Sequence, residues 1–443
     1  MAVWMGFVNA MSNLICFWFI RFIKIGLFWN WYGLAVIVSY LIEACADFWN
    51  CFFQKKAYNG IMYSRILELS GKHSAFLFGP RGTGKTTWLK ESFKNAFYLD
   101  LLDTELYREL LLYPDHLEQL IPPDFDDWII LDEIQKVPAL LNEVHRLIEG
   151  KKLRFILTGS SARKLRKKGV NLLAGRAHTE FFYPLTAREL GKDFDLAHAL
   201  RYGFLPSIYS KRFDKNEAES YLKSYIFTYL KEEIQEEALT RNLSAFGRFL
   251  EAASLSQGSI LNVSQVAREA GVERKTVENY FTILEDLRFS YRLPAFTKRA
   301  KRKRLSHDKF YFFDAGVFHT LRPKGMLDTG EEIEGAGLET VFLQEAKALN
   351  DYLKLGYEIN YWRNDSQMEV DFVFYGEHKL LAFEVKHARV LSPRDLRGLK
   401  SFKKEYPSAK LILLYGGDRK RYENGIEIIP FKDALLHLTD LLQ

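Results

Sequence analysis

The segment "GPRGTGKTT" contains residue types and spacings that bind nucleotide phosphates. It satisfies the pattern G-x-x-x-x-G-K-[ST] and directly follows the apolar run "AFLF". In this pattern, glycines let backbone N–H groups surround the phosphates, the lysine reaches the β- and γ-oxygens, and the hydroxyl ligates Mg²⁺. The sequence therefore predicts that ATP and Mg²⁺ bind at Gly79, Pro80, Arg81, Gly82, Thr83, Gly84, Lys85, Thr86 and Thr87.

Two later apolar runs end in polar residues that would complete this site. The run "WIIL" ends in Asp132 and Glu133. We expect Asp132 to hold the metal through water and Glu133 to orient or deprotonate the attacking water. The run "FILTGSS" places Thr158 and Ser160 at another strand end, where a polar side chain can sense the γ-phosphate. Since hydroxyl, carboxylate and lysine groups are all present, the sequence predicts hydrolysis of ATP as well as binding.

A second set of chemically capable residues lies in "EVDFVFYGEHKLLAFEVK", residues 369–386. Alternation along two strands directs Val370, Phe372 and Phe374 to one face, and Glu369 and Asp371 to the other. A turn centred between Glu377 and His378 would set Asp371 opposite Glu384.

On the second strand, Leu381, Phe383 and Val385 share a face, so Glu384 and Lys386 share the opposite one. Facing carboxylates repel each other, so a cation is expected between them: Lys386, a divalent metal, or both. With Glu339 from the preceding amphipathic helix, these oxygens predict Mg²⁺ ligands, and Lys386 could position or activate a water.

The region between the two sites reads as mostly helical, with apolar positions at three- to four-residue spacing. "NVSQVAREAGVERKTVENYF" has a helix-turn-helix layout: Ser264 is a candidate helix cap, Gly271 permits the turn and a second helix runs from 276 to 287. Arg274, Lys275 and Asn279 would face a DNA major groove. The basic run "KRAKRKR", residues 298–304, would meet phosphates or be a solvated loop.

The first 61 residues differ in composition from the rest, because they hold all three cysteines, Cys16, Cys45 and Cys51. No disulfide framework is implied, and a reducing cytoplasm fits. Residues 1–20 and 25–42 are uncharged and long enough to span a bilayer, with Arg21 and Lys24 between them. The segment is therefore a membrane anchor, an extended start before Met62, or a buried appendage. The net charge of +6 does not by itself imply a nucleic-acid partner.

The loop, "DEIQ", "TGSS", "LAGR" and "YPLTARE" together make residues 62–190 resemble the AAA+-like ATPase domain of a bacterial and archaeal family. In that family this domain precedes a C-terminal domain of unknown function of the DUF4143 type. The resemblance implies that Arg176 stabilises transition-state charge, within its own subunit or from a neighbouring one in a homo-oligomer. Residues 231–234, "KEEI", depart from the Arg-Asp that relatives carry.

The helix glutamate, the aspartate and E-x-K also resemble the PD-(D/E)xK nuclease core, over about residues 335–443. The expected fold is α/β with five parts: a hydrophobic segment (1–61), a P-loop ATPase domain (62–190), a helical lid or linker (191–240), a winged-helix-like domain (241–330) and a restriction-endonuclease-like domain (331–443). The leading hypothesis is an ATPase that controls DNA binding or metal-dependent cleavage. The alternative is a nucleotide-dependent switch that binds a protein partner through a non-catalytic nuclease fold.

Overall fold

A five-stranded parallel sheet forms the first part of the chain in the computed structural model, which describes residues 62–71, 73–161, 163, 165, 173–229, 242–297, 308–323, 325 and 330–443. The strand order is β2-β3-β4-β1-β5. The strands are β1 (Ser74–Phe78), β2 (Phe97–Asp100), β3 (Trp128–Asp132), β4 (Arg154–Gly159) and β5 (Ala177–Phe181). The helices of this part are α3 (Lys85–Ser92), α4 (Thr104–Leu112), α5 (His116–Leu120) and α6 (Leu140–Lys151), with short turns η1 (Ile134–Lys136) and η2 (Leu173–Gly175).

Both faces of this sheet are covered, because its strands are apolar at successive positions. Phe76 and Phe78 of β1 join one hydrophobic cluster with Leu147 of α6, whereas Leu77 joins a second cluster. Near-continuous apolar strands are typical of parallel sheets with buried faces. The carboxyl ends of β1, β3 and β4 therefore meet at one edge, where the chain becomes polar.

The next part is helical and carries a small three-stranded antiparallel sheet of order β6-β8-β7. Its strands are β6 (Ser259–Ile260), β7 (Ser290–Leu293) and β8 (Lys309–Phe312). The helical elements are α8 (Ala187–Leu190), η3 (Gly191–Asp193), α9 (Leu196–Tyr202), α10 (Pro206–Ser210), α11 (Lys215–Ser224), the π-helix η4 (Tyr225–Tyr229), α13 (Leu243–Ser254), α14 (Val263–Ala270), α15 (Arg274–Asp286) and α16 (Ala315–Leu321).

The helix pair α14–α15 follows the expected layout with two corrections. Val266, Ala267 and Ala270 are buried, and Gly271 takes a φ of 65° at the turn. Ser264 is not the cap, because Asn262 precedes the helix and its side chain accepts from the Gln265 amide at 3.1 Å. The second helix begins at Arg274, two residues earlier than the apolar spacing suggests.

The last part is a six-stranded mixed sheet of order β13-β14-β12-β11-β10-β9. Strands β9 (Glu358–Arg363), β10 (Glu369–Tyr375) and β11 (Leu380–Lys386) are antiparallel neighbours, and β12 (Lys410–Tyr415) and β14 (Ile426–Pro430) continue the sheet in parallel to β11. β13 (Arg421–Glu423) forms the edge. The helices are α17 (Gly330–Tyr352), α18 (Arg397–Glu405), α19 (Phe431–Leu436) and α20 (Leu438–Leu442).

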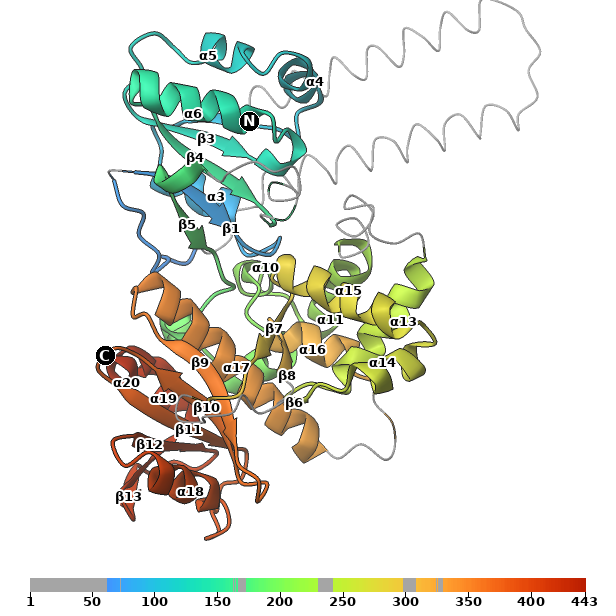
Figure 1. Cartoon of the computed structure of the whole chain (residues 1–443), viewed down its shortest axis with the longest axis vertical. Coiled ribbons are helices and arrows are strands. Elements are labelled where there is room, and N and C mark those ends of the chain that lie inside the picture. The colour runs from blue at the N-terminus through green and yellow to red at the C-terminus, as the bar shows by residue number, and fades with distance from the viewer. Residues whose placement is uncertain are drawn as a thin grey trace, which may run out of the picture. The chain divides into compact units, whose positions relative to one another are not determined.

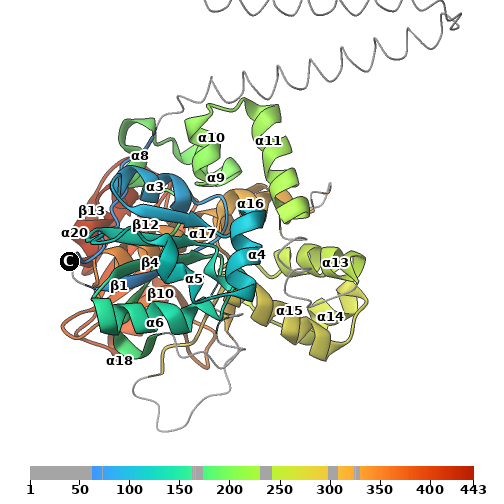
Figure 2. The same ribbon diagram turned by 90° about the horizontal axis from the view of Figure 1, so that it is seen from above.

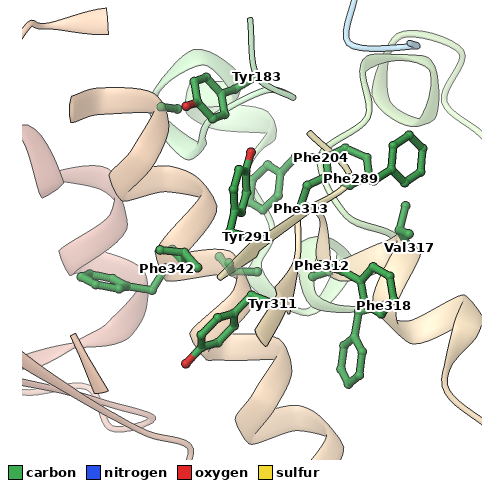
Figure 3. Close-up of a cluster of buried hydrophobic side chains, with 14 of the residues drawn as sticks. Tyr183, Phe204, Phe289, Tyr291, Tyr311, Phe312, Phe313, Val317, Phe318 and Phe342 are labelled. Atoms are coloured by element: carbon green, nitrogen blue, oxygen red, sulfur yellow. The ribbon is translucent and has the colours of Figure 1, made fainter. Parts of the chain in front are cut away.

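Helix α17 links the parts of the described chain (Figures 1 and 2). It begins at Gly330, earlier than the predicted helix start, and Leu338, Val341, Phe342 and Ala346 are buried as expected. One hydrophobic cluster contains Leu77 of the first sheet, Phe342 of α17 and Leu442 near the end of the chain. Aromatic side chains fill the centre of this cluster, among them Tyr291, Tyr311 and Phe342 (Figure 3).

Residues 62–443 form one compact unit by their contacts, and residues 1–61 are counted apart from it. Several of the predicted features lie outside the described residues: the hydrophobic segment 1–61, the departure at 231–234 and the basic run 298–304. No helix within the described ranges is both long and apolar enough to cross a membrane. The finer boundaries at 190, 240 and 330 stay predictions.

Candidate nucleotide site and C-terminal acid cluster

The loop between β1 and α3 has a conformation that needs its glycines. Gly82 and Gly84 have φ angles of 74° and 90°, a region that residues with side chains seldom adopt. A Cβ on Gly79 would lie 2.2 Å from the Phe182 carbonyl oxygen. The loop therefore turns tightly over the end of β1, and Gly84 directly precedes the first turn of α3.

The Lys85 side chain lies inside this loop and is only 8% exposed. Its ammonium group donates to the carbonyl oxygens of Gly79 at 2.6 Å and Pro80 at 3.0 Å. The Thr83 hydroxyl donates to the same Pro80 oxygen at 2.8 Å. A phosphate entering the loop would offer Lys85 stronger, charged acceptors than these neutral carbonyls.

Asp132 lies at the end of β3 and is 4% exposed. The Thr86 hydroxyl donates to its Oδ2 at 2.9 Å, and the hydroxyls of Tyr98 and Thr158 also donate to its carboxylate. Thr86 and Asp132 thus meet across the loop, as a Mg²⁺ site of this class requires. The parallel sheet brings them together, since Asp132 is far along the chain from Thr86.

Glu133 follows with a left-handed backbone, φ 62°, which is uncommon for a residue with a side chain. Its amide donates to the Thr158 hydroxyl at 3.4 Å, and its carboxylate accepts from the Gln135 amide group. Burial raises the pKa of Glu133, and the nearby Lys85 charge opposes that rise. A carboxylate with a raised pKa beside the loop is suited to accept a proton from water.

The positions of Thr158 and Ser160 fit their predicted place at the strand end, and both are buried. Gly159 between them is closely packed, because a Cβ there would lie 2.3 Å from Gln135 Oε1. The "DEIQ" and "TGSS" segments therefore fit against each other directly. Of the remaining loop residues, Thr86 and Thr87 are exposed and Pro80 is buried.

Sequence reasoning missed three side chains that form hydrogen bonds with the loop or with Asp132 beside it. The Arg65 guanidinium donates to the Thr83 carbonyl at 2.9 Å, and the Tyr225 hydroxyl donates to the Arg81 carbonyl at 2.9 Å. Tyr98 contributes its hydroxyl to Asp132 from β2. Their local sequences hold no pattern of the kind that marks the loop, so only the fold reveals them.

Arg176 lies at the opposite edge of the sheet from the loop. It directly precedes β5, whose first residue Ala177 pairs with Ser74 at the start of β1. The loop follows the other end of β1, about 13 Å away at the rise of a strand. Arg176 forms an ion pair with Glu149 of α6, and this contact lowers the pKa of Glu149. The geometry therefore disfavours action of Arg176 on its own subunit's nucleotide.

In the C-terminal sheet, the predicted register of β10 and β11 is confirmed. Phe372 pairs with Phe383 and Val373 with Ala382, so Asp371 continues the ladder opposite Glu384. The Asp371 carboxylate accepts from the Val385 amide at 3.0 Å. The turn centre inferred between Glu377 and His378 is therefore right.

One part of the predicted alternation is wrong. The pairing of β10 with β9 shifts between Val370 and Val373, and this irregularity interrupts the alternation. Val370 packs with Val373 in one cluster, whereas Phe372 and Phe374 belong to another. Leu381, Phe383 and Val385 do share a cluster, as expected. A bulge commonly re-aims side chains near a site.

A lysine that sequence reasoning missed lies next to the facing carboxylates. Lys309, the first residue of β8, is 2% exposed. Its ammonium group lies 2.5 Å from Glu369 Oε1, 3.4 Å from Asp371 Oδ1 and 4.0 Å from Glu339 Oε2. Burial lowers the pKa of Lys309, but Tyr311 and the carboxylates of Glu339 and Asp371 raise it well above its usual range. Lys309 is therefore charged.

Lys386 pairs with Glu384 instead, at 2.7 Å. Burial and the Asp371 charge raise the pKa of Glu384 to about 8, and the same two causes raise the pKa of Glu339 to about 7. The Tyr311 hydroxyl donates to Glu339 at 2.7 Å. We call Glu339, Glu369, Asp371 and Glu384 the acid cluster.

Within the described part of the chain, no group of three or more His, Cys, Asp or Glu side chains is arranged to hold a metal ion. The donor set is nevertheless of the type that Mg²⁺ prefers, and the buried Glu384 Oε2 has no hydrogen-bond partner. Glu339 also lines a cavity of about 250 Å³, together with Arg322 and Glu332. Glu339, Asp371 and Glu384 could thus serve as ligands only after a rearrangement around Lys309.

The candidate DNA-facing residues lie together on α15. Arg274, Lys275 and Asn279 are exposed, whereas Val277 and Tyr280 on the other face are buried. Arg274 forms an ion pair with Glu278 one turn along, at 2.9 Å. The helix therefore presents two cationic side chains and an amide at its surface.

The parallel five-stranded sheet, with the loop between β1 and α3, fits a P-loop-like AAA domain. Domain-family models match three stretches of the chain. An AAA domain matches residues 72–191, a domain of unknown function (DUF8612) matches residues 193–328, and a domain of unknown function (DUF4143) matches residues 334–434. The chain thus carries an AAA domain followed by a C-terminal DUF4143 domain, which confirms the resemblance seen in the sequence. An AAA domain indicates nucleotide-binding ATPase activity.

No curated protein matches the chain. Among solved structures, protein VC1899 from Vibrio cholerae is similar at 11% sequence identity, over 78% of this chain and 97% of that chain. The TM-score of 0.21 is too low to support an argument about fold or function.

Proposed function

We propose that the chain hydrolyses ATP with Mg²⁺ at the loop Gly79–Thr87. The observation that carries this proposal is the meeting of Thr86, Asp132 and Thr158 at one edge of the sheet, through hydroxyl groups that donate to one carboxylate. Thr86 and Asp132 would hold Mg²⁺, which would neutralise charge on the phosphates. Their position beside the loop supports hydrolysis in addition to binding.

Each of the chain's own groups has a distinct task in this proposal. Lys85 exchanges the carbonyls of Gly79 and Pro80 for phosphate oxygens, where its charge stabilises the transition state. Glu133 orients the attacking water and accepts its proton. Thr158 contacts both Asp132 and the Glu133 amide, so it can report the presence of the γ-phosphate to both carboxylates.

In this proposal, Arg176 stabilises the transition state at the nucleotide of a neighbouring subunit. Its position beside the start of β1 supports delivery to another chain's nucleotide and not to its own. We therefore propose a homo-oligomer in the nucleotide-bound state. Arginines supplied from a second chain are a common device for stabilising charge in phosphoryl transfer.

We further propose that the C-terminal domain is a PD-(D/E)xK nuclease-like domain and that ATP hydrolysis controls DNA binding or metal-dependent cleavage. The antiparallel strands β9, β10 and β11, the parallel continuation through β12, and helices α17 and α18 packed against these strands support this fold. Asp371, Glu384 and Lys386 lie on its hairpin.

A DNA contact through the middle part is supported by its topology. Helices α13, α14 and α15 together with the sheet β6-β8-β7 support the proposed winged-helix layout. The exposed Arg274, Lys275 and Asn279 lie on the second helix of the pair. The basic run 298–304 follows β7 and precedes β8 in the sequence, and phosphates would be its partner.

Coupling between the two sites has a physical route along α17. Arg65 donates to the loop carbonyl of Thr83 and also to the Tyr352 hydroxyl at 3.3 Å. Tyr352 is the last residue of α17, and Glu339 of the acid cluster lies on the same helix. The two residues are about 20 Å apart at the rise of an α-helix. A shift of the loop on nucleotide binding would therefore act on the helix that carries Glu339.

One experiment tests both the ATPase proposal and the nuclease proposal. It compares wild type, Lys85→Ala and Asp371→Ala for phosphate release from ATP and for cleavage of DNA with Mg²⁺ or Mn²⁺. Lys85→Ala is expected to abolish ATP turnover, because the loop lysine is the group that reaches the β- and γ-oxygens in this pattern. Asp371→Ala should abolish cleavage and leave ATP turnover unchanged. Wild-type protein that leaves all DNA and RNA intact, with and without ATP, contradicts the nuclease half.

A second candidate function is favoured by one observation. The Lys309 ammonium lies among the carboxylates where a catalytic metal would be needed. In this alternative the chain is a nucleotide-dependent switch, and its nuclease fold only docks a protein partner. It predicts ATP binding without cleavage under any metal, and co-purification of one partner that depends on the nucleotide state.

A further inference from the structure

The position of Lys309 is set by a rigid element, because β8 is the central strand of its sheet. Its backbone pairs with Ile260 of β6 on one side and with Leu293 of β7 on the other. Strand alternation directs Lys309 and Tyr311 to the same face, and both reach the acid cluster. The small sheet in the middle part of the chain therefore holds the Lys309 ammonium group among the carboxylates of the C-terminal site.

The contacts of Lys309 resemble those of a bound cation. Three carboxylates from two different elements surround its ammonium group, Glu369 and Asp371 from β10 and Glu339 from α17. At 2% exposure, water contributes little to its solvation. The opposite charges around such a buried ammonium group compensate for its lost hydration.

The acid cluster has more acceptors than these lysines satisfy. Four carboxylates face the two ammonium groups of Lys309 and Lys386, and Glu369 also pairs with the Arg363 guanidinium at 3.8 Å. Glu384 Oε2 has no hydrogen-bond partner, although its side chain is only 9% exposed. An unpartnered buried carboxylate oxygen is costly, and a proton or a cation would remove that cost. Of these four carboxylates, Glu339 lines a cavity of about 250 Å³.

We propose that Glu339, Asp371 and Glu384 form a divalent-cation site that the ammonium group of Lys309 masks. A divalent ion and an ammonium group bound to the same oxygens of Glu339 and Asp371 would repel each other strongly at this separation. The site therefore accepts a divalent ion only when Lys309 is withdrawn, and β8 is its autoinhibitory element. This inference rests on the proposed C-terminal site and adds what controls it.

The test measures Mn²⁺ binding to the full chain without nucleotide, by electron paramagnetic resonance of free Mn²⁺. Lys309→Met is expected to bind one Mn²⁺ per chain more than wild type, and Lys309→Met/Asp371→Asn should lose that extra ion. Lys410→Met is the matched control, because Lys410 also pairs with a glutamate but is 51% exposed and lies away from the cluster. Equal Mn²⁺ binding by Lys309→Met and wild type overturns the proposal.

A second measurement keeps the proposal testable if Lys309→Met does not fold. Wild type and Asp371→Asn should bind equal amounts of Mn²⁺, because the masked site contributes nothing. Weaker binding by Asp371→Asn shows that the wild-type site is open and overturns the proposal. The DNA cleavage assay separates the masking proposal from the nuclease proposal. Extra Mn²⁺ bound by Lys309→Met without DNA cleavage supports masking and contradicts nuclease activity. Cleavage by wild type and Lys309→Met at equal rates supports nuclease activity and contradicts masking.

Discussion

Replacing Arg65 by methionine is expected to lower the free energy of unfolding by about 3 kcal/mol. The side chain is 4% exposed and lies 3.0 Å from Glu189, whose side chain is 0% exposed. Loss of one partner of a buried ion pair costs about 3 to 5 kcal/mol, because the other charge is left uncompensated. Here the lower end applies, since Glu189 still accepts from the backbone amides of Ile66 at 2.8 Å and Thr186 at 2.9 Å.

The assay is urea unfolding followed by far-UV circular dichroism, with stability taken from the midpoint at a common slope. The double variant Arg65→Met/Glu189→Gln should recover part of the loss, because no buried charge remains unpaired. Arg146→Met is the matched control: Arg146 also pairs with glutamates but is 50% exposed, so its midpoint should stay close to that of wild type. A midpoint shift for Arg65→Met no larger than that of Arg146→Met would refute the reasoning.

Two further predictions concern a buried aspartate and the strand-end threonine. Burial raises the pKa of Asp314 from 3.8 to about 6. A carboxyl group whose pKa is raised by folding stabilises the folded state below pH 4, and this contribution is lost as the pH rises to about 6. The free energy of unfolding of wild type, relative to that of Asp314→Asn, should therefore fall by about 3 kcal/mol across this window. A difference in urea midpoints that does not change with pH would contradict this prediction. Thr158→Val should reduce the turnover number for ATP about 10²-fold with little change in ATP affinity, because it removes a hydrogen bond to the Asp132 carboxylate and one from the Glu133 backbone amide. Thr179→Val, an exposed threonine of β5, is the control, and an equal effect of both would count against a role in the site.

Much of the nucleotide site could be predicted because its signals are local. The loop conformation depends on glycines at fixed spacing and on a strand before and a helix after it, all within 74–92. The place of Asp132 and Thr158 followed from apolar runs that end in polar residues, since parallel strands end at the same edge of a sheet. Tyr98 escaped prediction because nothing in "FYLD" shows which neighbour its strand will pair with.

In the C-terminal site too, local features could be predicted from the sequence and contacts with distant strands could not. Counting back from the turn gave the register of Asp371 and Glu384 correctly, because an antiparallel hairpin fixes its own pairing. The irregularity between Val370 and Val373 depends on β9, a partner outside the hairpin, and it therefore turned Val370 to the other face without any signal in the hairpin's own sequence.

The sequence by itself determined where phosphates would bind and which carboxylates would face each other, because both depend on residues close in the chain. Only the tertiary structure decided which cations reach those groups. It turned Arg176 away from its own loop, since the start of β5 lies beside the start of β1. It also brought Lys309 to Asp371 and Arg65 to Tyr352. Long cationic side chains are held by the fold that surrounds them, and their partners come from distant segments whose meeting no local pattern encodes.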